Sequence, residues 1–469
     1  MTVWPLRFRD LTDDTLVFGN EAGGWFKSDH KFLARYAEDR LTLADQEFLA
    51  LHGHSYESAG DLAFNAFAYR WVGRQNAVRP LSYVLLIPTL RCNISCTYCQ
   101  VSRAAPEAKG YDWTPETLRD VRTFLDRIEC DEVKVEFQGG EPLLRIDLLE
   151  EVREFARKRF TKSEFVVCTN LQRLGEREWA FFDSEDTHIS TSIDGPPEAH
   201  DKQRTQDRAL LTEFLTNLET AHRRVGAARL SALPTIDPFD PPDLSGLIET
   251  YLRYGLTSIY LRPINHHGFA RRLGQRPNEI ERWNALHSEF VELLIERNAA
   301  ADTVVQEYYF TQCLNRVLRS GVNNHVDIRN PNILAADSIV IDYDGALYPT
   351  DESRMLSRIG HIDLSIGSVK TGVNRGKVNE LNQSCANNFD PDCVHCPYQP
   401  FCGTDIIDDI SRYGRIDIPR HTTWFCKRHL AVFDKVFDLI YRNDAKTKRS
   451  LAAWAGIPEW TDGIGVRHS

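Results

Sequence analysis

The sequence lacks any long hydrophobic run. No stretch of its 469 residues approaches the roughly 18 uncharged apolar residues that a membrane span requires. The N-terminal residues, MTVWPLRFRD, contain no apolar core of the kind found in a secretion signal. We therefore expect a cytoplasmic protein without a membrane partner.

An excess of basic charge is also absent. The chain has 56 Lys and Arg residues against 67 Asp and Glu residues, a net charge of −11, and its pI is about 5.8. Non-specific binding to nucleic acid or to an anionic membrane requires a basic face. This balance argues against both partners, although it is compatible with a local basic groove for an acidic peptide.

Cysteine is missing from residues 1–80, and the 11 cysteines that follow are clustered. Three lie within eight residues, and five lie between Cys385 and Cys426. In a protein without a secretion signal, such clusters indicate metal or redox sites rather than structural disulfides.

The length predicts more than one domain, because 469 residues are more than one compact hydrophobic core usually holds. No low-complexity tract or solenoid repeat is present. Residues 1–80 are predicted to form a small α+β, winged-helix-like module. It has a β-hairpin over 15–26 and short helices at 31–36 and 43–52. The rest divides into a barrel over 81–275, a helical bridge over 276–330 and a cysteine-rich domain over 331–469.

The barrel prediction comes from alternating strand and helix patterns. Leu118, Val121, Phe124 and Leu125 recur at helical spacing within 115–128. Repeated β/α units imply an α/β fold with a parallel sheet, here a partial (β/α)6 TIM-like barrel. The six predicted strands are 83–88, 132–137, 164–168, 188–193, 229–235 and 258–263. Further along, we predict a loop over 374–392 and a closing amphipathic helix over 428–442.

The first cysteine cluster directly follows the first predicted strand. Cys92, Cys96 and Cys99 form a C-x3-C-x2-C run. Three thiolates at this spacing can wrap one face of an iron–sulfur cubane and leave its fourth iron without a protein ligand. A zinc site short of one ligand, or three unrelated thiols, are the alternatives.

This motif resembles the signature of the radical S-adenosylmethionine (SAM) superfamily, with Tyr98 in its aromatic position. The resemblance implies a [4Fe–4S] cluster on these cysteines, with SAM chelating the open iron. It further implies an external electron donor such as flavodoxin or ferredoxin. Reduction would cleave SAM to a 5′-deoxyadenosyl radical, which abstracts a hydrogen atom from the substrate.

Further family-like motifs follow the later strands. The loop Gly139-Gly140-Glu141 after the second strand resembles the loop that binds the SAM amino group, and glycine permits such a close approach. Each of these residues by itself is equally explained as a turn or cap. All lie where parallel barrels place their active sites, at the carboxyl ends of strands. The remaining candidate SAM contacts are Asn170, Ser192, Asp194, Arg204 and Arg262.

The second cysteine cluster consists of four residues in the C-terminal section. Four thiolates can hold either an iron–sulfur cluster or a tetrahedral zinc ion. The spacing resembles the auxiliary-cluster segment of SPASM domains, which implies iron–sulfur. The full pattern has cysteines where this chain has Thr350 and Ile406, so we expect only one auxiliary [4Fe–4S] cluster. Its predicted ligands are Cys393, Cys396, Cys402 and Cys426.

Other candidate groups have weaker signals. Asp351 follows Thr350, and in sulfatase-maturing relatives the aspartate at the corresponding position takes a proton from substrate. Asp351 is therefore the candidate general base. Cys385 is either an extra ligand or a free thiol, while Cys130 and Cys168 are interpreted as buried core thiols.

The resemblance covers about residues 83–429 and is strongest to maturases of the His-Xaa-Ser peptide system. Relatives of that class modify ribosomally made precursor peptides (RiPPs). We expect an oxidoreductase that forms a side-chain crosslink, namely a cyclophane, thioether or ether. The N-terminal module would bind a leader peptide as an added strand, or merely cap the barrel.

Three alternative functions remain. A peptide epimerase would need a hydrogen-donating thiol, for which Cys313 or Cys385 are candidates. A sulfatase-type maturase would form formylglycine. The third alternative is a non-catalytic, metal-stabilised scaffold that binds peptides.

Overall fold

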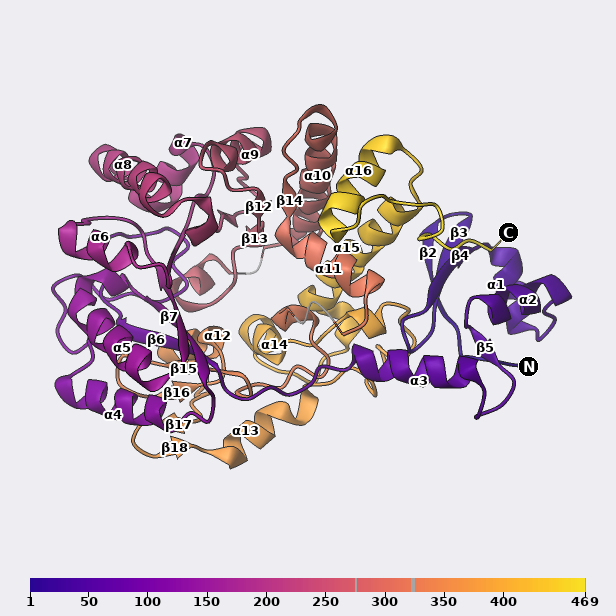
Figure 1. Ribbon diagram of the computed structural model, residues 1–469, viewed down its shortest axis with the longest axis horizontal. Coiled ribbons are helices and arrows are strands. Elements are labelled where there is room, and N and C mark those ends of the chain that lie inside the picture. Colours follow the sequence, from indigo (N-terminus) through magenta and orange to yellow (C-terminus); the bar gives the residue numbers. More distant parts are fainter. Residues whose placement is uncertain (275, 322–324, 469) are drawn as a thin grey trace.

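A computed structural model describes residues 1–274, 276–321 and 325–468. Along its long axis, the α/β barrel lies at one end, a helical and cysteine-rich part lies in the middle, and the N-terminal module lies at the other end (Figure 1). No helix of the described residues is both long and apolar enough to cross a membrane.

The N-terminal module is built on a three-stranded antiparallel sheet of β2 (Arg7–Thr12), β3 (Thr15–Gly19) and β4 (Trp25–Ser28). The predicted hairpin is β3–β4, and the two predicted helices are α1 (His30–Ala37) and α2 (Leu43–Leu51). Buried side chains between sheet and helices form its core: Leu6, Leu16, Phe18, Phe26, Phe32 and Leu49. The sequence did not predict three further elements, β1 (Thr2–Val3), β5 (Ser55–Tyr56) and α3 (Leu62–Arg74).

The main sheet has seven strands in the order β10-β9-β8-β7-β6-β15-β16. Consecutive strands β6 to β10 pair in parallel, with helices between them. The α/β class and the parallel sheet are thus confirmed. The strands are β6 (Tyr83–Thr89), β7 (Glu132–Gly139), β8 (Lys162–Cys168), β9 (Thr187–Thr191) and β10 (Leu230–Ala232). The helices are α4 (Pro115–Asp126), α5 (Ile146–Arg159), α6 (Glu176–Phe182), α7 (Pro197–His200), α8 (Arg208–Val225) and α9 (Leu244–Arg253).

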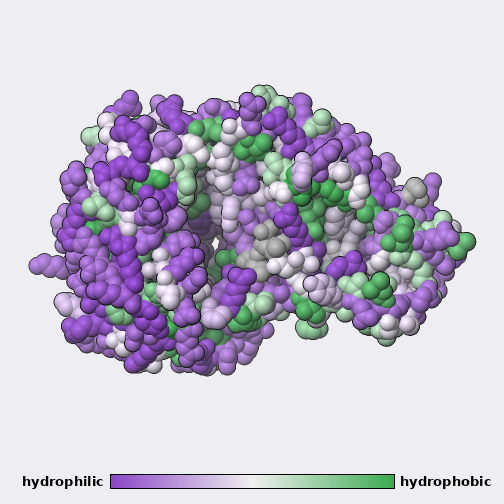
Figure 2. Space-filling model, in the orientation of Figure 1, coloured by the Kyte–Doolittle hydropathy of each residue, from purple (hydrophilic) through white to green (hydrophobic). Residues whose placement is uncertain are grey.

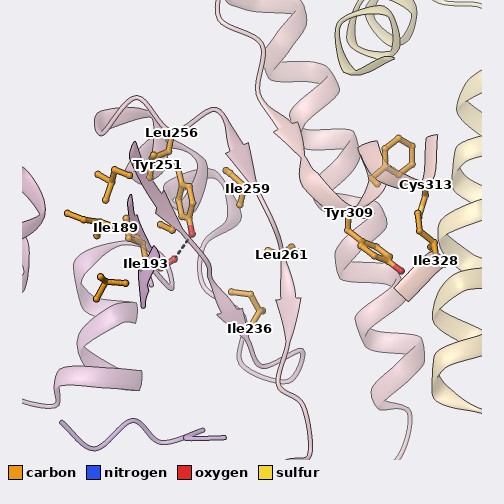
Figure 3. Packing of buried hydrophobic residues seen from close by; sticks show 14 of the residues in the cluster. Ile189, Ile193, Ile236, Tyr251, Leu256, Ile259, Leu261, Tyr309, Cys313 and Ile328 are labelled. Atoms are coloured by element: carbon orange, nitrogen blue, oxygen red, sulfur yellow. Dashed lines mark hydrogen bonds between the residues drawn. The ribbon is translucent and has the colours of Figure 1, made fainter. Parts of the chain in front are cut away.

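The two faces of this sheet differ in polarity. Along β7, Val133, Val135 and Phe137 are buried, while Glu136 and Gln138 on the opposite face are half-buried. Successive residues of a strand point to opposite faces, so the alternation separates a dry helix-covered face from a polar inner face. Figure 3 shows the apolar packing around β9 and α9, where the Tyr251 hydroxyl donates a hydrogen bond to the Ile193 carbonyl (3.2 Å).

The last two predicted strands are wrong as continuous elements. Each is broken: β10 is followed by β11 (Thr235–Ile236), and β12 (Ser258–Ile259) is followed by β13 (Arg262–Pro263). Pro234, which has no N–H for a sheet ladder, lies at the first break. β13 pairs with β11, so the sixth unit lies outside the main sheet.

The C-terminal part contributes to the barrel instead. β15 (Ser338–Ile341) pairs in parallel with β6, and β16 (Leu347–Tyr348) follows antiparallel to β15. α12 (Asp351–Arg358) starts directly after this hairpin.

Helices of the bridge and of the C-terminal part pack together in the middle of the molecule (Figure 1). They are α10 (Glu279–Ala300), α11 (Tyr308–Leu318), α15 (Trp424–Tyr441) and α16 (Ala445–Ala455). The predicted closing helix corresponds to α15, and α16 was not predicted. The smaller elements are β14 (Gln306–Glu307), β17 (Gly367–Ser368), β18 (Gly372–Val373) and α14 (Ile406–Tyr413).

The predicted loop over 374–392 is wrong in part. α13 (Arg375–Leu381) lies within it, and the Asn374 side chain accepts from the Lys377 N–H (3.2 Å). Asparagine marks a helix start here rather than a loop, because its side-chain oxygen satisfies a free N–H of the first turn.

Replacing Leu86 tests the packing of the barrel. Leu86 is fully buried on the helix-covered face of β6, so Leu86→Ala should destabilise the barrel by about 2–5 kcal/mol. Chemical unfolding followed by circular dichroism measures this. The control Glu132→Ala, at the exposed start of β7, should change stability by less than about 0.5 kcal/mol. Equal effects of the two changes would contradict the assigned faces.

Candidate functional site

A cavity of about 340 Å³ opens at the carboxyl ends of the barrel strands. In Figure 2 the molecular surface is hollowed at the centre of the face shown. The cavity brings together most of the SAM-site residues predicted from the sequence. They are Cys92, Cys96, Tyr98, Cys99, Gly139, Gly140, Asn170, Ser192, Arg204 and Arg262.

The three clustered thiols lie on the loop after β6. Burial, with smaller contributions from Glu141 and the two other thiols, raises the pKa of Cys92 to about 12. Thiolates so close together repel one another, and bound cations relieve that repulsion. Among the described residues, no three such side chains converge to hold one metal ion. A cubane is bound differently, because its thiolates attach to separate irons.

The loop after β7 packs directly on the backbone of the cysteine loop. Gly140 N–H donates to the Thr89 carbonyl (3.1 Å), and Glu141 N–H donates to the Arg91 carbonyl (2.8 Å). A Cβ on Gly140 would lie 2.2 Å from the Arg91 oxygen, and Gly139 has φ of +124°. Only glycine fits at both positions, because each lies against backbone atoms of residues 89–91.

Glu141 supports this loop from behind the cavity. It is 1% exposed, and its carboxyl accepts from Asn170 N–H (2.8 Å) and Leu143 N–H (3.1 Å). Burial raises its pKa to about 7. Glu141 thus ties the end of β7 to the end of β8, and it does not line the cavity.

Asp194 and Arg204 form an ion pair beside the thiols. Arg204 Nε donates to Asp194 Oδ2 (2.9 Å), and the Tyr98 hydroxyl donates to the same carboxylate. Asp194 also accepts from Thr235 N–H (3.0 Å) and is 2% exposed. Arg204 Nη1 lies 3.9 Å from Cys96 Sγ. Tyr98 therefore fastens the cysteine loop to the segment after β9.

The inner face of the barrel extends the cavity with residues that the sequence analysis missed. Glu136, Cys168 and Ser190 line it below the glycine loop. Cys168 Sγ donates to Glu136 Oε1 (3.2 Å), as does Gln138 Nε2. The interpretation of Cys168 as a core thiol is wrong, because its strand position faces the cavity. Cys130 is likewise only partly buried.

Asp351 lies at the start of α12, near this inner face. It is 9% exposed and accepts from Arg354 Nε (2.7 Å), whose guanidinium is fully buried. The raised pKa of the Cys168 thiol results from burial, then Glu136, with a smaller contribution from Asp351. Met355, one turn along α12, lines the cavity. The C-terminal part thus brings a carboxylate close to the SAM cavity.

The four cysteines of the second cluster line a separate cavity of about 240 Å³: Cys393, Cys396, Cys402 and Cys426. Burial and the neighbouring Cys396 raise the pKa of Cys426 to about 12. Phe8 and Arg9 of β2 line the same cavity, and Arg9 pairs with Asp434 (2.6 Å). The N-terminal module therefore contacts this site.

The two candidate hydrogen-donating thiols are poorly placed. Cys313 is fully buried on α11 beside Tyr309 and Ile328 (Figure 3). Cys385 lines neither of the two cavities. Cys168 is the thiol outside the C-x3-C-x2-C run that lines the SAM cavity.

Comparison with protein families identifies the barrel. The sequence model of the Radical SAM superfamily matches residues 86–240. The chain contains a radical SAM domain. This domain includes the three thiols, the glycine loop and the Asp194–Arg204 pair.

Two relatives match different lengths of the chain. A cysteine-type anaerobic sulfatase-maturating enzyme of Clostridium novyi is 24% identical over 341 residues, 69% of this chain and 87% of that protein. An uncharacterised protein of Methanothermobacter thermautotrophicus is 32% identical over 128 residues, 26% of this chain and 46% of that protein. The chain thus spans less than half of that relative.

A solved structure shares the fold. The structure described as native anSMEcpe with bound AdoMet has a TM-score of 0.59 and 16% identity, covering 76% of this chain and 97% of that chain. At this identity the likeness concerns the fold alone.

Gly140→Ala tests the geometry of the glycine loop. The added methyl group would overlap the Arg91 carbonyl, so the loop must move and SAM binding should weaken at least tenfold. Equilibrium dialysis of reconstituted protein with labelled SAM measures this. Gly60→Ala is the control, because a Cβ there meets nothing within 4 Å. SAM affinity of Gly140→Ala within twofold of the wild type would contradict the assignment.

Proposed function

We propose that this protein is a radical SAM enzyme that modifies a ribosomally made peptide. The observation that carries the proposal is one cavity that joins three cysteines at cubane spacing, the glycine loop and a polar inner wall. A structure of similar fold, at a TM-score of 0.59 and 16% identity, is described as native anSMEcpe with bound AdoMet and a peptide. The Clostridium novyi relative is named for the maturation of a sulfatase, so it too acts on a polypeptide.

The cofactors supply the radical. Cys92, Cys96 and Cys99 would hold a [4Fe–4S] cluster with one iron left for SAM, and the bound group would supply a 5′-deoxyadenosyl radical after one-electron reduction by a flavodoxin or ferredoxin. The residues present fit this group, because the three thiols line the same cavity as Gly139 and Gly140.

The protein's own residues would position SAM. Backbone carbonyls of Gly139 and Gly140 would accept hydrogen bonds from the SAM amino group. Asn170 and Ser192 would offer polar side chains at the ends of β8 and β9, where they line the cavity. Arg204, held by Asp194, and Arg262 face the same cavity and carry positive charge for the SAM carboxylate.

The substrate would enter along the inner face of the barrel. Glu136, Cys168 and Ser190 supply a polar wall for a peptide segment. Main-chain amides of a peptide need hydrogen-bond partners once buried, and an apolar wall would leave them unsatisfied.

Crosslinking is the preferred outcome. After loss of a hydrogen atom, bond formation to an aromatic ring or heteroatom releases one proton and one electron. Asp351 would take the proton, held in place by Arg354. Cys393, Cys396, Cys402 and Cys426 would hold one auxiliary [4Fe–4S] cluster, which can accept electrons.

Two further outcomes have a specific observation behind them. Cys168 lies in the SAM cavity, where its thiol could return a hydrogen atom to the substrate, as an epimerase requires. The match to a sulfatase-maturating enzyme favours formylglycine formation.

Metal content tests the cofactor assignment. Anaerobically reconstituted protein should contain about eight irons, two cubanes, and should release 5′-deoxyadenosine from SAM after reduction. The variant C92A/C96A/C99A should lose about four irons and all cleavage. The variant C393A/C396A/C402A/C426A should lose the other four. About one zinc and no SAM cleavage would instead support a peptide-binding scaffold.

Mass spectrometry of a co-expressed precursor peptide tests the reaction. A loss of two hydrogens without a new aldehyde group indicates a crosslink, whereas formylglycine carries an aldehyde. An unchanged mass in ordinary water, together with deuterium incorporation when the reaction runs in heavy water, indicates epimerisation.

Asp351→Asn tests the general base, because asparagine keeps the size of the side chain but cannot take a proton. Reduced Asp351→Asn protein should still cleave SAM but modify the peptide at least tenfold more slowly. Asp363→Asn, on an exposed carboxylate, is the matched control. Unimpaired peptide modification by Asp351→Asn would remove Asp351 from this role.

A further inference from the structure

A second cavity, of about 750 Å³, adjoins the SAM cavity. Its walls come from residues 102–108, which follow the third cysteine of the C-x3-C-x2-C run, from the 3-10 helix η4 (Gly268–Leu273), and from the end of α12, which packs against η4. Arg103 lines both cavities. The two cavities therefore share a wall, and a ligand of one lies beside a ligand of the other.

The helix η4 packs directly on the loop that carries the thiols. Ala270 N–H donates to the Cys99 carbonyl (3.1 Å). A Cβ on Gly268 would lie 1.7 Å from the Gln100 carbonyl oxygen, and Gly268 has φ of +49°. Only glycine permits this approach. The wall of the second cavity is thus fixed relative to the reaction site.

The second cavity is positively charged, although the chain as a whole has a net charge of −11. Arg103 and Arg271 donate to a serine hydroxyl and to a main-chain carbonyl, which are neutral partners. Arg358 Nη1 donates to the Tyr343 hydroxyl (3.2 Å). Cations that lie close together repel one another, and a bound anion relieves that repulsion. Among the described residues, the lining contains no Asp or Glu and four arginines: Arg103, Arg271, Arg272 and Arg358.

Aromatic rings hold two of these arginines in place. The Arg358 guanidinium lies 5.0 Å from the centre of the Tyr111 ring and 5.3 Å from that of Tyr343. The Arg272 guanidinium lies 4.7 Å from the centre of the Phe269 ring. A guanidinium oriented in this way presents its planar fork to a carboxylate with little further loss of freedom. Tyr111 and Phe269 also line the cavity, where they offer contact area to the carbon atoms of a ligand.

We propose that this arginine cavity, lined by Arg103, Arg271, Arg272 and Arg358, binds an acidic segment of the substrate peptide. The identification of the ligand as the substrate rests on the proposed function, whereas the anionic-peptide site does not. Cavities of about 300–1,000 Å³ bury ligands of drug size, so this one accommodates several side chains. A recess admits side chains but not the convex surface of a folded electron donor. Because the SAM cavity shares Arg103, the acidic residues would lie close in sequence to the modified residue.

Binding of fluorescently labelled hexaglutamate tests the charge of the arginine cavity, with fluorescence anisotropy of the reconstituted full chain as the measurement. Arg272→Glu and Ala105→Glu, both at exposed positions of the wall, should each weaken binding about tenfold, because like charges then face each other. Ala105→Lys should strengthen binding about threefold, since it adds an attractive charge. A merely structural role of the wall would not follow the sign of the charge. Arg223→Glu, exposed on α8, is the matched control.

Equal affinity of hexaglutamate for the wild type, Arg272→Glu and Ala105→Glu would overturn the proposal. Full displacement of hexaglutamate by an equal concentration of inorganic phosphate would overturn it too, because the site would then hold only a small anion. A third contrary result is slower SAM cleavage by Arg272→Glu with flavodoxin but not with dithionite, which would place the electron donor there.

Saturating hexaglutamate should also slow the modification of the precursor peptide by the wild type. Unslowed modification would show that the occupant is not the substrate, and would contradict the proposal. Hexaglutamate binding requires no radical chemistry, so its failure is distinguishable from a failure of the wild type to release 5′-deoxyadenosine, which would refute the proposed function.

Discussion

The close contact between two backbones at the mouth of the barrel is the constraint on which the site depends. Gly139 and Gly140 press against the carbonyl groups of Thr89 and Arg91, where no side chain fits. This contact fixes the loop of Cys92, Cys96 and Cys99 relative to β7. Glu141 and Tyr98 extend the connection to the ends of β8 and β9 through buried hydrogen bonds. Three strand ends thus hold the cysteine loop, which gives an otherwise irregular segment a defined shape.

Charged side chains around the thiols compensate the charge of the thiolates. Burial raises the pKa of Cys92 and of Cys96, so the thiolate forms need compensation. Arg204 supplies part of it, and Asp194 in turn holds Arg204 in place. A positively charged cluster core would supply the rest. At the second site, Arg9 of the N-terminal module and Arg420 of the C-terminal part both line the cavity and favour the Cys426 thiolate, so part of the charge compensation comes from a distant part of the chain.

Local patterns in the sequence predicted much of this arrangement. The cysteine spacing, the paired glycines and the apolar periodicity of 115–128 depend on residues a few positions apart. Such short-range patterns predicted α4 and the β3–β4 hairpin, and most of the SAM-site residues predicted from them line the SAM cavity. Placement of the candidate SAM contacts at strand ends followed from the geometry of parallel sheets.

Long-range pairings could not be predicted in this way. Nothing near Ser338 indicates that its strand joins β6, which lies far earlier in the chain, and nothing near His468 indicates a hydrogen bond with Asp45. Cys168 was misjudged because the sequence does not say which face of β8 is dry. α13 was missed because Asn374, which commonly marks a loop, also starts helices.

An open coordination position on one iron of the N-terminal cluster is the central claim. Electron paramagnetic resonance of the reduced C393A/C396A/C402A/C426A variant examines that iron directly, because only the cluster on Cys92, Cys96 and Cys99 contributes to the signal. Addition of SAM should change the g values of the spectrum, since SAM becomes a ligand of the cluster. A spectrum unchanged by saturating SAM would mean that the fourth iron is already capped, and would contradict radical chemistry at this site.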